Sequence, residues 1–228
     1  MLTADEWSAL ILSVKVSLWC VAVILPPGVA LGWLLARHQF RGKALIEAVA
    51  HLPMVLPPVV TGYVLLLAFG RHGWLGRWLE SFGLSLAFSW KGAVLASAAM
   101  SFPLMVRAVR LSMSLIDPRL EQAARTLGAG PVRVFFTITL PLAAPGLVTG
   151  AILSFARSLG EFGATITFVG NIEGETRTLP LALYTYTQTP GTEAPALRLV
   201  GIATTVAFAA LLGSEFLTRR AERRLSGE

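Results

Sequence analysis

Arg157 and Glu161 are the pair of side chains whose types and spacing best suit chemistry in this sequence. They lie four residues apart in ARSLGEFGA, at the end of a long hydrophobic stretch, and this spacing places them on one helical face. Ionisable groups near membrane depth are costly and are functional candidates by default. The arginine would attract an anion, and the carboxylate would temper that attraction so that the anion can leave. Gly160 permits a backbone break that suits a gate; the alternative is a structural ion pair that pins the helix end.

The sequence contains no set of residues suited to catalysis. Asp occurs only at Asp5 and Asp117, the three histidines form no H-E-x-x-H motif, and no G-x-S-x-G elbow is present. Cys20 is the only cysteine, which excludes an internal disulfide and a cysteine metal cluster. No G-x-x-x-x-G-K-[ST] loop occurs, so ATP must be hydrolysed elsewhere if ATP is used. We therefore expect no catalytic residue, no metal and no cofactor in this chain.

The elements that position these residues are membrane spans. Of the 228 residues, 54% are hydrophobic and 14% are charged, whereas soluble domains carry about 25% charged residues. Several runs reach the roughly 20 apolar residues that cross a bilayer, so we expect an all-α polytopic membrane protein. Its domain covers residues 9–217, between a short segment at 1–8 and a tail at 218–228. The five expected spans are Leu10–Leu35, Val49–Phe69, Gly92–Leu111, Val134–Phe155 and Leu199–Leu217.

Proline interrupts four of these spans. Each proline removes a backbone donor and is expected to kink its helix. In lipid the freed carbonyls need partners, so such sites should face neighbouring helices or a water-lined path. Pro57, Pro103 and Thr149 are our candidates for lining such a path, between two copies of the chain. The prolines are Pro26 and Pro27, Pro57 and Pro58, Pro103, and Pro141 and Pro145.

Basic residues predict the orientation. Twelve of the 19 Lys and Arg residues lie after the first span, at the end of the third span and in the segment that follows it, or in the tail, and five lie in the other connections. Basic residues gather on the cytoplasmic side, so we expect the N-terminus outside and the C-terminus inside. This distribution also accounts for the net charge of +6 without a nucleic-acid partner.

The polar segment between the third and fourth spans has the signals of a short helix. Asp117 and Pro118 suit a helix start, and Gly128 supplies the freedom that ends a helix in a left-handed turn. A helix over about 118–128 is too short to be stable alone. Ala123 and Ala124 give it a slim face for a partner, and Glu121 near its start suits the helix dipole. An amphipathic helix lying on the membrane surface is the alternative.

Further residues carry a resemblance to a known family. The segment EQAARTLGAGPVRVFFTITLP resembles the cytoplasmic "EAA" loop of bacterial ABC-importer permeases, which touches the ATPase subunit. The segments HLPMVLPPVVTGY, FPLMVRAVR, FARSLGEFGAT and ETRTLPLALYT look like those of molybdate ABC-transporter permeases, over nearly the whole chain. The resemblance implies a type I importer fold and assigns ATPase coupling to Glu121, Ala123, Ala124 and Gly128.

The same resemblance implies the partners and the membrane. Such permeases lie in the bacterial cytoplasmic membrane, dimerise, pair with two ATPase subunits and receive the ion from a binding protein. Related sulfate permeases share the loop but are usually longer. The substrate class is therefore a tetrahedral oxyanion, molybdate first and sulfate or tungstate as alternatives. An ion-gradient-driven transporter is the less favoured alternative. Such a transporter has no need of the docking loop that this sequence carries, and many have inverted repeats, which the sequence does not show.

Overall fold

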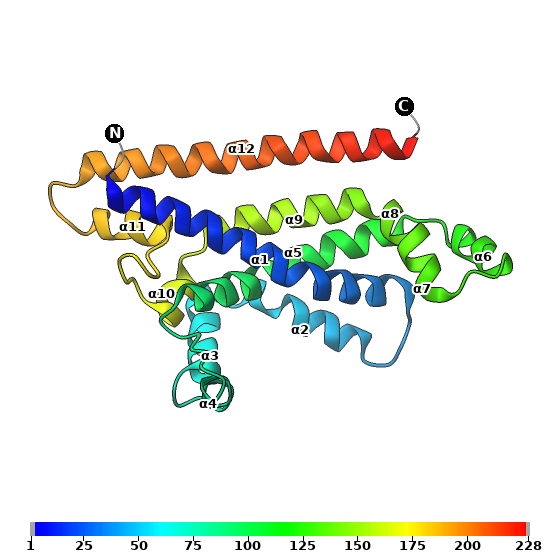
Figure 1. Cartoon of the computed structure of the whole chain (residues 1–228), viewed down its shortest axis with the longest axis horizontal. Coiled ribbons are helices and arrows are strands. Elements are labelled where there is room, and N and C mark those ends of the chain that lie inside the picture. The colour runs from blue at the N-terminus through cyan, green and yellow to red at the C-terminus, as the bar shows by residue number, and fades with distance from the viewer. Residues whose placement is uncertain (1–2, 227–228) are drawn as a thin grey trace.

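The computed structural model describes residues 3–226, with side chains described as far as Gly213 and for Phe216. Helices are the only regular elements in this part of the chain, and they lie mostly along one axis (Figure 1). The elements are α1 (Ala4–Arg37), α2 (Lys43–Val55), α3 (Pro58–Phe69), α4 (Trp74–Glu80), α5 (Trp90–Ser114), α6 (Pro118–Thr126), α7 (Pro131–Val134), the π-helical turn η1 (Phe135–Thr139), α8 (Leu140–Leu142), α9 (Ala144–Leu159), α10 (Gly163–Val169), α11 (Leu179–Thr187) and α12 (Glu193–Ser226).

The core forms where α1, α5 and α9 pack along their lengths. Cys20, Met105, Val109 and Met113 are buried in one hydrophobic cluster between these helices. Small residues let the backbones approach, as is common between membrane helices: a Cβ added at Gly32 would lie 2.6 Å from the side chain of Val109. The first and third predicted spans are thus confirmed as long helices, and both are extended by a few residues at each end.

The second and fourth predicted spans are broken rather than merely kinked. Three helices, α1, α5 and the part of α12 up to Gly213, are long and apolar enough to cross a membrane. The total reaches five if α2 with α3, bent by 112°, and the segment from Pro131 to Leu142 with α9, bent by 67°, each count as one span. The prediction of five spans therefore agrees with the structure only if each of the two bent helix pairs is counted as one span.

Proline explains one break but does not act alike everywhere. Leu56 and Pro57 both precede a proline, which disfavours the helical region, and both have extended backbones, with ψ of 145° and 133°. By contrast, α1 runs through Pro26 and Pro27 without ending, so the kink expected there does not interrupt the helix. The break in the fourth span lies at Ala143 and follows the π-helical turn.

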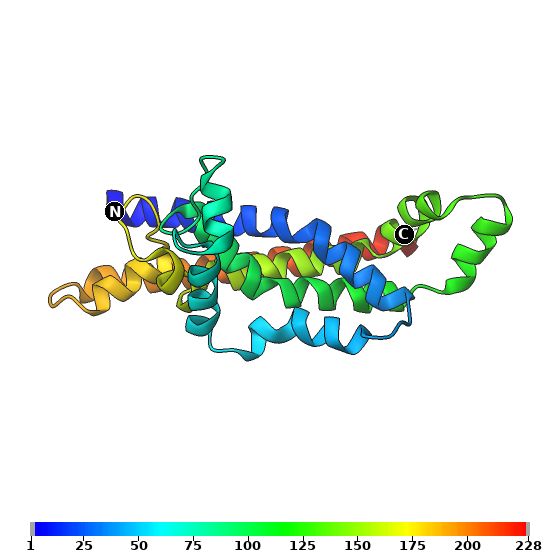
Figure 2. The same ribbon diagram turned by 90° about the horizontal axis from the view of Figure 1, so that it is seen from below.

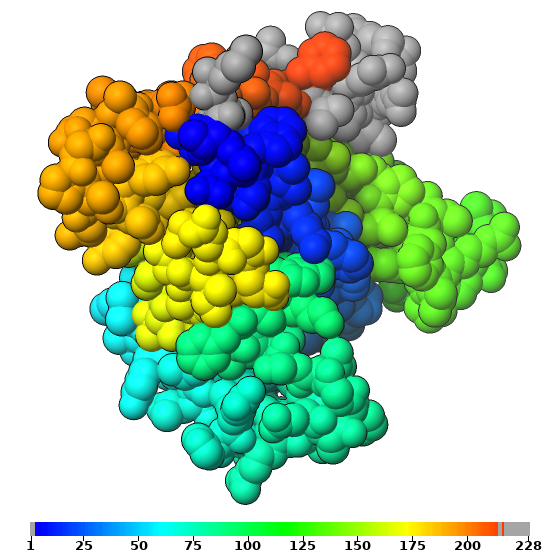
Figure 3. All heavy atoms as spheres, turned by 60° about the vertical axis from the view of Figure 1, so that its left-hand side comes forward, coloured from blue at the N-terminus to red at the C-terminus, as the bar shows by residue number. Residues whose placement is uncertain are grey.

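The two ends of the molecule differ. α6 projects at one end, and α10, α11 and the start of α1 gather at the other (Figures 1 and 2). In the space-filling view of the second end, the segment between α10 and α11 (yellow) lies between the start of α1 (blue) and the connection into α5 (green; Figure 3). α12 runs the length of the bundle beside α9 and continues into the predicted tail as far as Ser226; residues 227–228 lie outside the described part.

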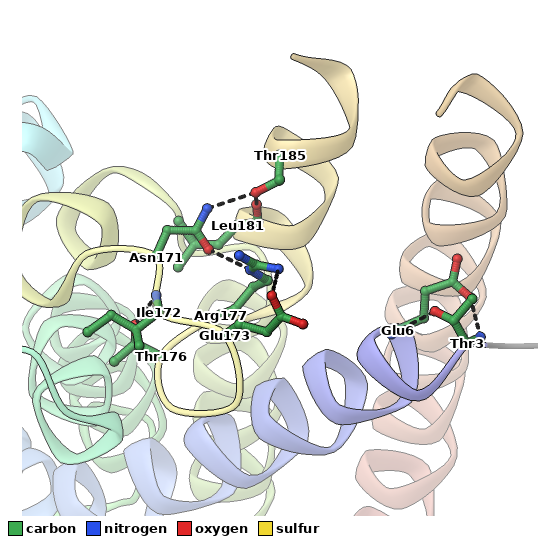
Figure 4. Close-up of polar contacts among 9 residues, drawn as sticks. All are labelled: Thr3, Glu6, Asn171, Ile172, Glu173, Thr176, Arg177, Leu181 and Thr185. Atoms are coloured by element: carbon green, nitrogen blue, oxygen red, sulfur yellow. Dashed lines mark hydrogen bonds and ion pairs between the residues drawn. The ribbon is translucent and has the colours of Figure 1, made fainter. Parts of the chain in front are cut away.

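The polar segment between α10 and α11 is an ordered turn. Arg177 binds Asn171 at 3.1 Å and Glu173 at 3.0 Å, and Asn171 donates to Thr185 of α11 at 2.8 Å (Figure 4). The amide of Ile172 donates to the Thr176 hydroxyl at 2.9 Å. This network holds α11 against the bundle, and the nine residues of α11 are too few to span a membrane.

Candidate functional site

Local signals in the sequence define both ends of α6. The Asp117 side chain accepts a hydrogen bond from the amide of Arg119 at 2.9 Å, which caps the helix start. At the other end, Gly128 has φ of +86°, and the amides of Gly128 and Ala129 donate to the carbonyls of Arg125 and Ala124. This pattern is a Schellman motif, so the predicted role of Gly128 in ending the helix is confirmed.

The outer face of α6 has no partner within the described part of the chain. None of its residues is buried. Ala123 is exposed, Ala124 is half-buried, and the neighbouring leucines Leu120 and Leu127 are 49% and 88% exposed. A helix that presents two leucines and a small alanine surface at one end of a molecule is suited to packing against another protein.

Glu121 points the other way. Its carboxylate lies 2.8 Å from the guanidinium of Arg37, at the end of α1, and accepts a hydrogen bond of 2.8 Å from Thr139 of η1. The Arg37 and Glu121 side chains are only 13% and 12% exposed, and Arg37 also donates to the Ile116 carbonyl at 3.3 Å. In the sequence Gln122 separates Glu121 from Ala123. We call Arg37, Glu121 and Thr139 the tie, because they join α6 to α1 and to the fourth span.

Arg37 and Thr139 were not singled out from the sequence. Arg37 entered only as one of the basic residues that predict orientation, and Thr139 belongs to the ITLP end of the loop motif. A signal was present for Arg37, which ends an apolar stretch where a carboxylate is a natural partner. For Thr139 the need for a partner appears only in the fold, because its hydroxyl is buried and must be satisfied within the protein.

The predicted pairing of Arg157 with Glu161 is present. Their charged groups are 2.7 Å apart, with Glu161 2% and Arg157 33% exposed. Glu161 has a second contact, since its carboxylate accepts a hydrogen bond of 2.8 Å from the amide of Ala164 in the first turn of α10. The pair therefore closes the end of α9 and caps the start of α10, which is the structural role given above as the alternative.

Two chain breaks meet at this pair. α9 ends at Leu159, just before Gly160, and α10 begins at Gly163, directly beside the break between α2 and α3. A Cβ added at Gly163 would lie 2.7 Å from the Pro58 side chain, and one at Gly62 would lie 2.5 Å from the Ala164 carbonyl oxygen. The structure thus brings Arg157, Gly160, Glu161 and the Pro57 break together in one region, as a gate requires. That they form a gate stays a prediction.

Thr149 and Pro103 lie elsewhere. Thr149 is half-buried on α9, where its hydroxyl donates to the Pro145 carbonyl at 2.9 Å, and it lines a groove between α5 and α9. Pro103 is buried within the chain, so this conformation gives it no surface on a path. Within the described residues, no three His, Cys, Asp or Glu side chains gather where they could hold a metal ion.

We predict that the two contacts of Glu161 are separable by mutation. Glu161→Gln keeps an oxygen that accepts from the Ala164 amide but loses the charge, whereas Glu161→Ala loses both. A helix cap contributes about 1 kcal/mol, so the alanine variant should unfold at a lower temperature than the glutamine variant. Thermal unfolding of the purified chain in detergent measures this. Equal midpoints for the two variants would mean that the cap contributes nothing.

Comparison with known proteins identifies the family to which this arrangement of helices belongs. The family described as binding-protein-dependent transport system inner membrane component matches residues 28–226. The chain belongs to this family. The match includes α6, both broken spans and the Arg157–Glu161 pair, so every element of the candidate site is part of the transport-system inner membrane component.

The chain is similar to two transport permeases in sequence and to one solved transporter in structure. The chain is 60% identical, over 98% of both chains, to the molybdenum transport system permease protein ModB of Escherichia coli strain K12. It is 40% identical to the sulfate transport system permease protein CysW of Synechocystis, over 76% of this chain and 63% of that protein. A bacterial alginate ABC transporter, solved with a pentasaccharide-bound periplasmic protein, superposes with a TM-score of 0.75 at 15% identity, over 96% of this chain and 80% of the other. The predicted all-helical transporter fold is confirmed.

Proposed function

We propose that this chain is the permease subunit of an ATP-driven importer that carries a tetrahedral oxyanion, molybdate first, across the cytoplasmic membrane. The observation that carries the proposal is the 60% identity to a molybdenum permease over 98% of both chains. The geometry supports the proposal, because α6 is a capped helix with an exposed apolar face, and the tie joins its inner face to α1 and to the fourth span. That arrangement suits a membrane component driven by another protein.

ATP hydrolysis belongs to a separate ABC ATPase subunit, and the chain itself binds no cofactor. We place the ATPase on the outer face of α6, through Ala123, Ala124 and the turn at Gly128. The oxyanion arrives from a binding protein at the opposite end, where α10, α11 and the start of α1 meet. Transport then proceeds by alternating access, with the region of the two chain breaks opening to one side at a time.

Two copies of the permease and two of the ATPase make up the transporter in this proposal. α2, α3 and α4 support it because they carry many large exposed apolar side chains, which a second copy or lipid must cover: Leu45, Val49, Val55, Tyr63, Leu67, Trp74 and Trp78. We expect native mass spectrometry of the purified transporter to give two permease chains for two ATPase chains. A single permease chain per complex would contradict the dimer.

The orientation makes a separate prediction. With the N-terminus outside, Thr126 at the end of α6 faces the cytoplasm and Ile172 faces outward; both are exposed. Thr126→Cys should react with an impermeant maleimide only in inverted vesicles, and Ile172→Cys only in whole spheroplasts. Cys20 is buried and should give a low background in both. Labelling of both new cysteines from the same side would contradict the predicted topology.

A competition uptake assay tests the proposed substrate. The permease is reconstituted with its ATPase and binding protein in vesicles, and uptake of radiolabelled molybdate is measured against unlabelled molybdate, tungstate and sulfate. We expect ATP-dependent uptake that molybdate and tungstate suppress and a tenfold excess of sulfate does not. Suppression by sulfate at equal concentration favours the sulfate alternative. Uptake that persists without ATP but collapses with the ion gradient favours a secondary transporter.

A further inference from the structure

The groove between α5 and α9 contains an arginine that the function described so far does not use. Arg107 lies on α5 with its side chain exposed, and it lines the groove together with Leu104 and Leu111 of α5 and Thr149 of α9. The groove has a volume of about 480 Å³. A water molecule takes about 30 Å³ in the liquid, so a small anion with several waters fits.

Unlike four other arginines of the bundle helices, Arg107 has no counter-charge among the described side chains. Among the described residues, Arg37 pairs with Glu121, Arg110 with Glu47, Arg157 with Glu161 and Arg198 with Glu6, and no ion pair forms at Arg107. The nearest basic neighbour along the helix, Arg110, is therefore neutralised from α2. Within the described part of the chain, no carboxylate occupies the guanidinium of Arg107, so its positive charge can act on a ligand.

Arg107 lies within α5 rather than at its end. It lies seven residues before Ser114, the last residue of α5, which places its Cα about 10 Å from the helix end along the axis. Charged side chains within membrane spans mostly face a bundle interior or a water-filled cavity. The side chain of Arg107 is exposed and lines the groove, which Ser112 and Thr149 also line.

The floor of the groove is tightly packed, so the anion cannot pass beneath Arg107. A Cβ added at Gly146 would lie 2.2 Å from the Cβ of Ser112, and one at Gly150 would lie 3.1 Å from the Cβ of Ala108. α5 and α9 therefore touch along these small residues, and Arg107 lies on the open side of the groove.

We propose that Arg107 contacts the translocated oxyanion, in the half of the path nearer α6. This inference rests on the proposed function. A guanidinium presents paired donors that match a tetrahedral oxyanion, and an exposed groove keeps the contact weak enough to release the ion. Arg157 is not equivalent, because Glu161 already neutralises it. The path thus has a compensated arginine near one end and an uncompensated one near the other.

The test measures ions imported per ATP hydrolysed, in vesicles that contain the complete transporter and molybdate as the probe. A charge-assisted hydrogen bond is about twice as strong as a neutral one, and we expect Arg107→Gln to lower the ratio about tenfold. Arg107→Lys keeps the charge and should recover much of the ratio. Arg77→Gln, which removes an exposed cation from α4 on the side of the bundle and away from α6, is the matched control and should stay within about twofold of the wild type.

The outcomes separate the possible roles. If Arg107→Gln lowers uptake and ATP hydrolysis together, so that the ratio is unchanged, Arg107 holds the fold or a lipid headgroup and the inference is overturned. A ratio that falls equally with Arg107→Lys and Arg107→Gln would overturn a charge contact as well. Failure of the proposed function looks different, because the wild-type transporter would then import no molybdate at all.

Discussion

Ala123→Asp should abolish binding of the ATPase while the permease remains folded. Ala123 is exposed on the outer face of α6, so the substitution removes no contact within the chain. In the complex, the new carboxylate would enter a packed interface without a partner. An unpaired buried charge costs about 3–5 kcal/mol, which is a loss of affinity of a hundredfold or more.

A pull-down of the ATPase by the permease, together with thermal unfolding of the permease alone, measures both parts of this result. Ala123→Ser is the matched control, since it keeps the small surface without a charge and should bind within a few-fold of the wild type. Gly128→Ala gives a milder loss, because a Cβ at φ of +86° costs about 1 kcal/mol. Full coupled uptake by Ala123→Asp would mean that the ATPase does not dock on α6.

Glu121→Leu should have the opposite pattern, with the ATPase still bound but uptake lost. Glu121 faces Arg37 and Thr139 rather than the outer surface. Removing one member of a buried pair typically costs about 3–5 kcal/mol. The two bonds from Arg37 to the Ile116 carbonyl should keep the cost near the lower end. Without the tie, movement of α6 no longer reaches α1 and the fourth span directly.

A double-mutant cycle with Arg37→Met separates stability from transmission. Arg37→Met with Glu121→Leu should be more stable than either single variant, since no unpaired charge remains, and yet uptake should stay low. Thr139→Val removes one hydrogen bond and should cost about 1 kcal/mol. Loss of ATPase binding in Glu121→Leu, with normal thermal stability, would instead identify Glu121 as a contact residue of the interface.

These contrasts show which parts of the site a sequence can predict. The bounds of α6 follow from neighbouring residues, an Asp-Pro start and a glycine end, so they were predictable. The direction of Glu121 depends on Arg37, 84 positions away, and no local pattern contains it. The sequence suggested Arg157 as the anion contact and already offered Glu161 as its ion-pair partner. Only the folded structure shows that Arg107 forms no ion pair with any of the side chains described.

The spans follow the same rule. Hydropathy is averaged over a window of residues, so it predicted the apolar stretches around α2 with α3 and around α9. A window average cannot predict the 112° bend between α2 and α3. That bend lies at successive prolines, where Gly62 packs against Ala164 of α10. The π-helical turn at Phe135–Thr139 likewise has no signature in hydrophobic periodicity. It places Thr139 where Glu121 can reach it.

The pairing of Glu6 with Arg198 has a consequence for how the protein is made. The Glu6 side chain is fully buried, and its carboxylate receives bonds of 2.6–3.2 Å from Arg198 in α12. These residues are 192 positions apart, so the ribosome synthesises nearly the whole chain before α1 can gain this partner. Until α12 inserts, the Thr3 capping contacts of Glu6 (Figure 4) leave its charge without a cation. A chain truncated before α12 therefore lacks the cation that neutralises Glu6 in the folded protein.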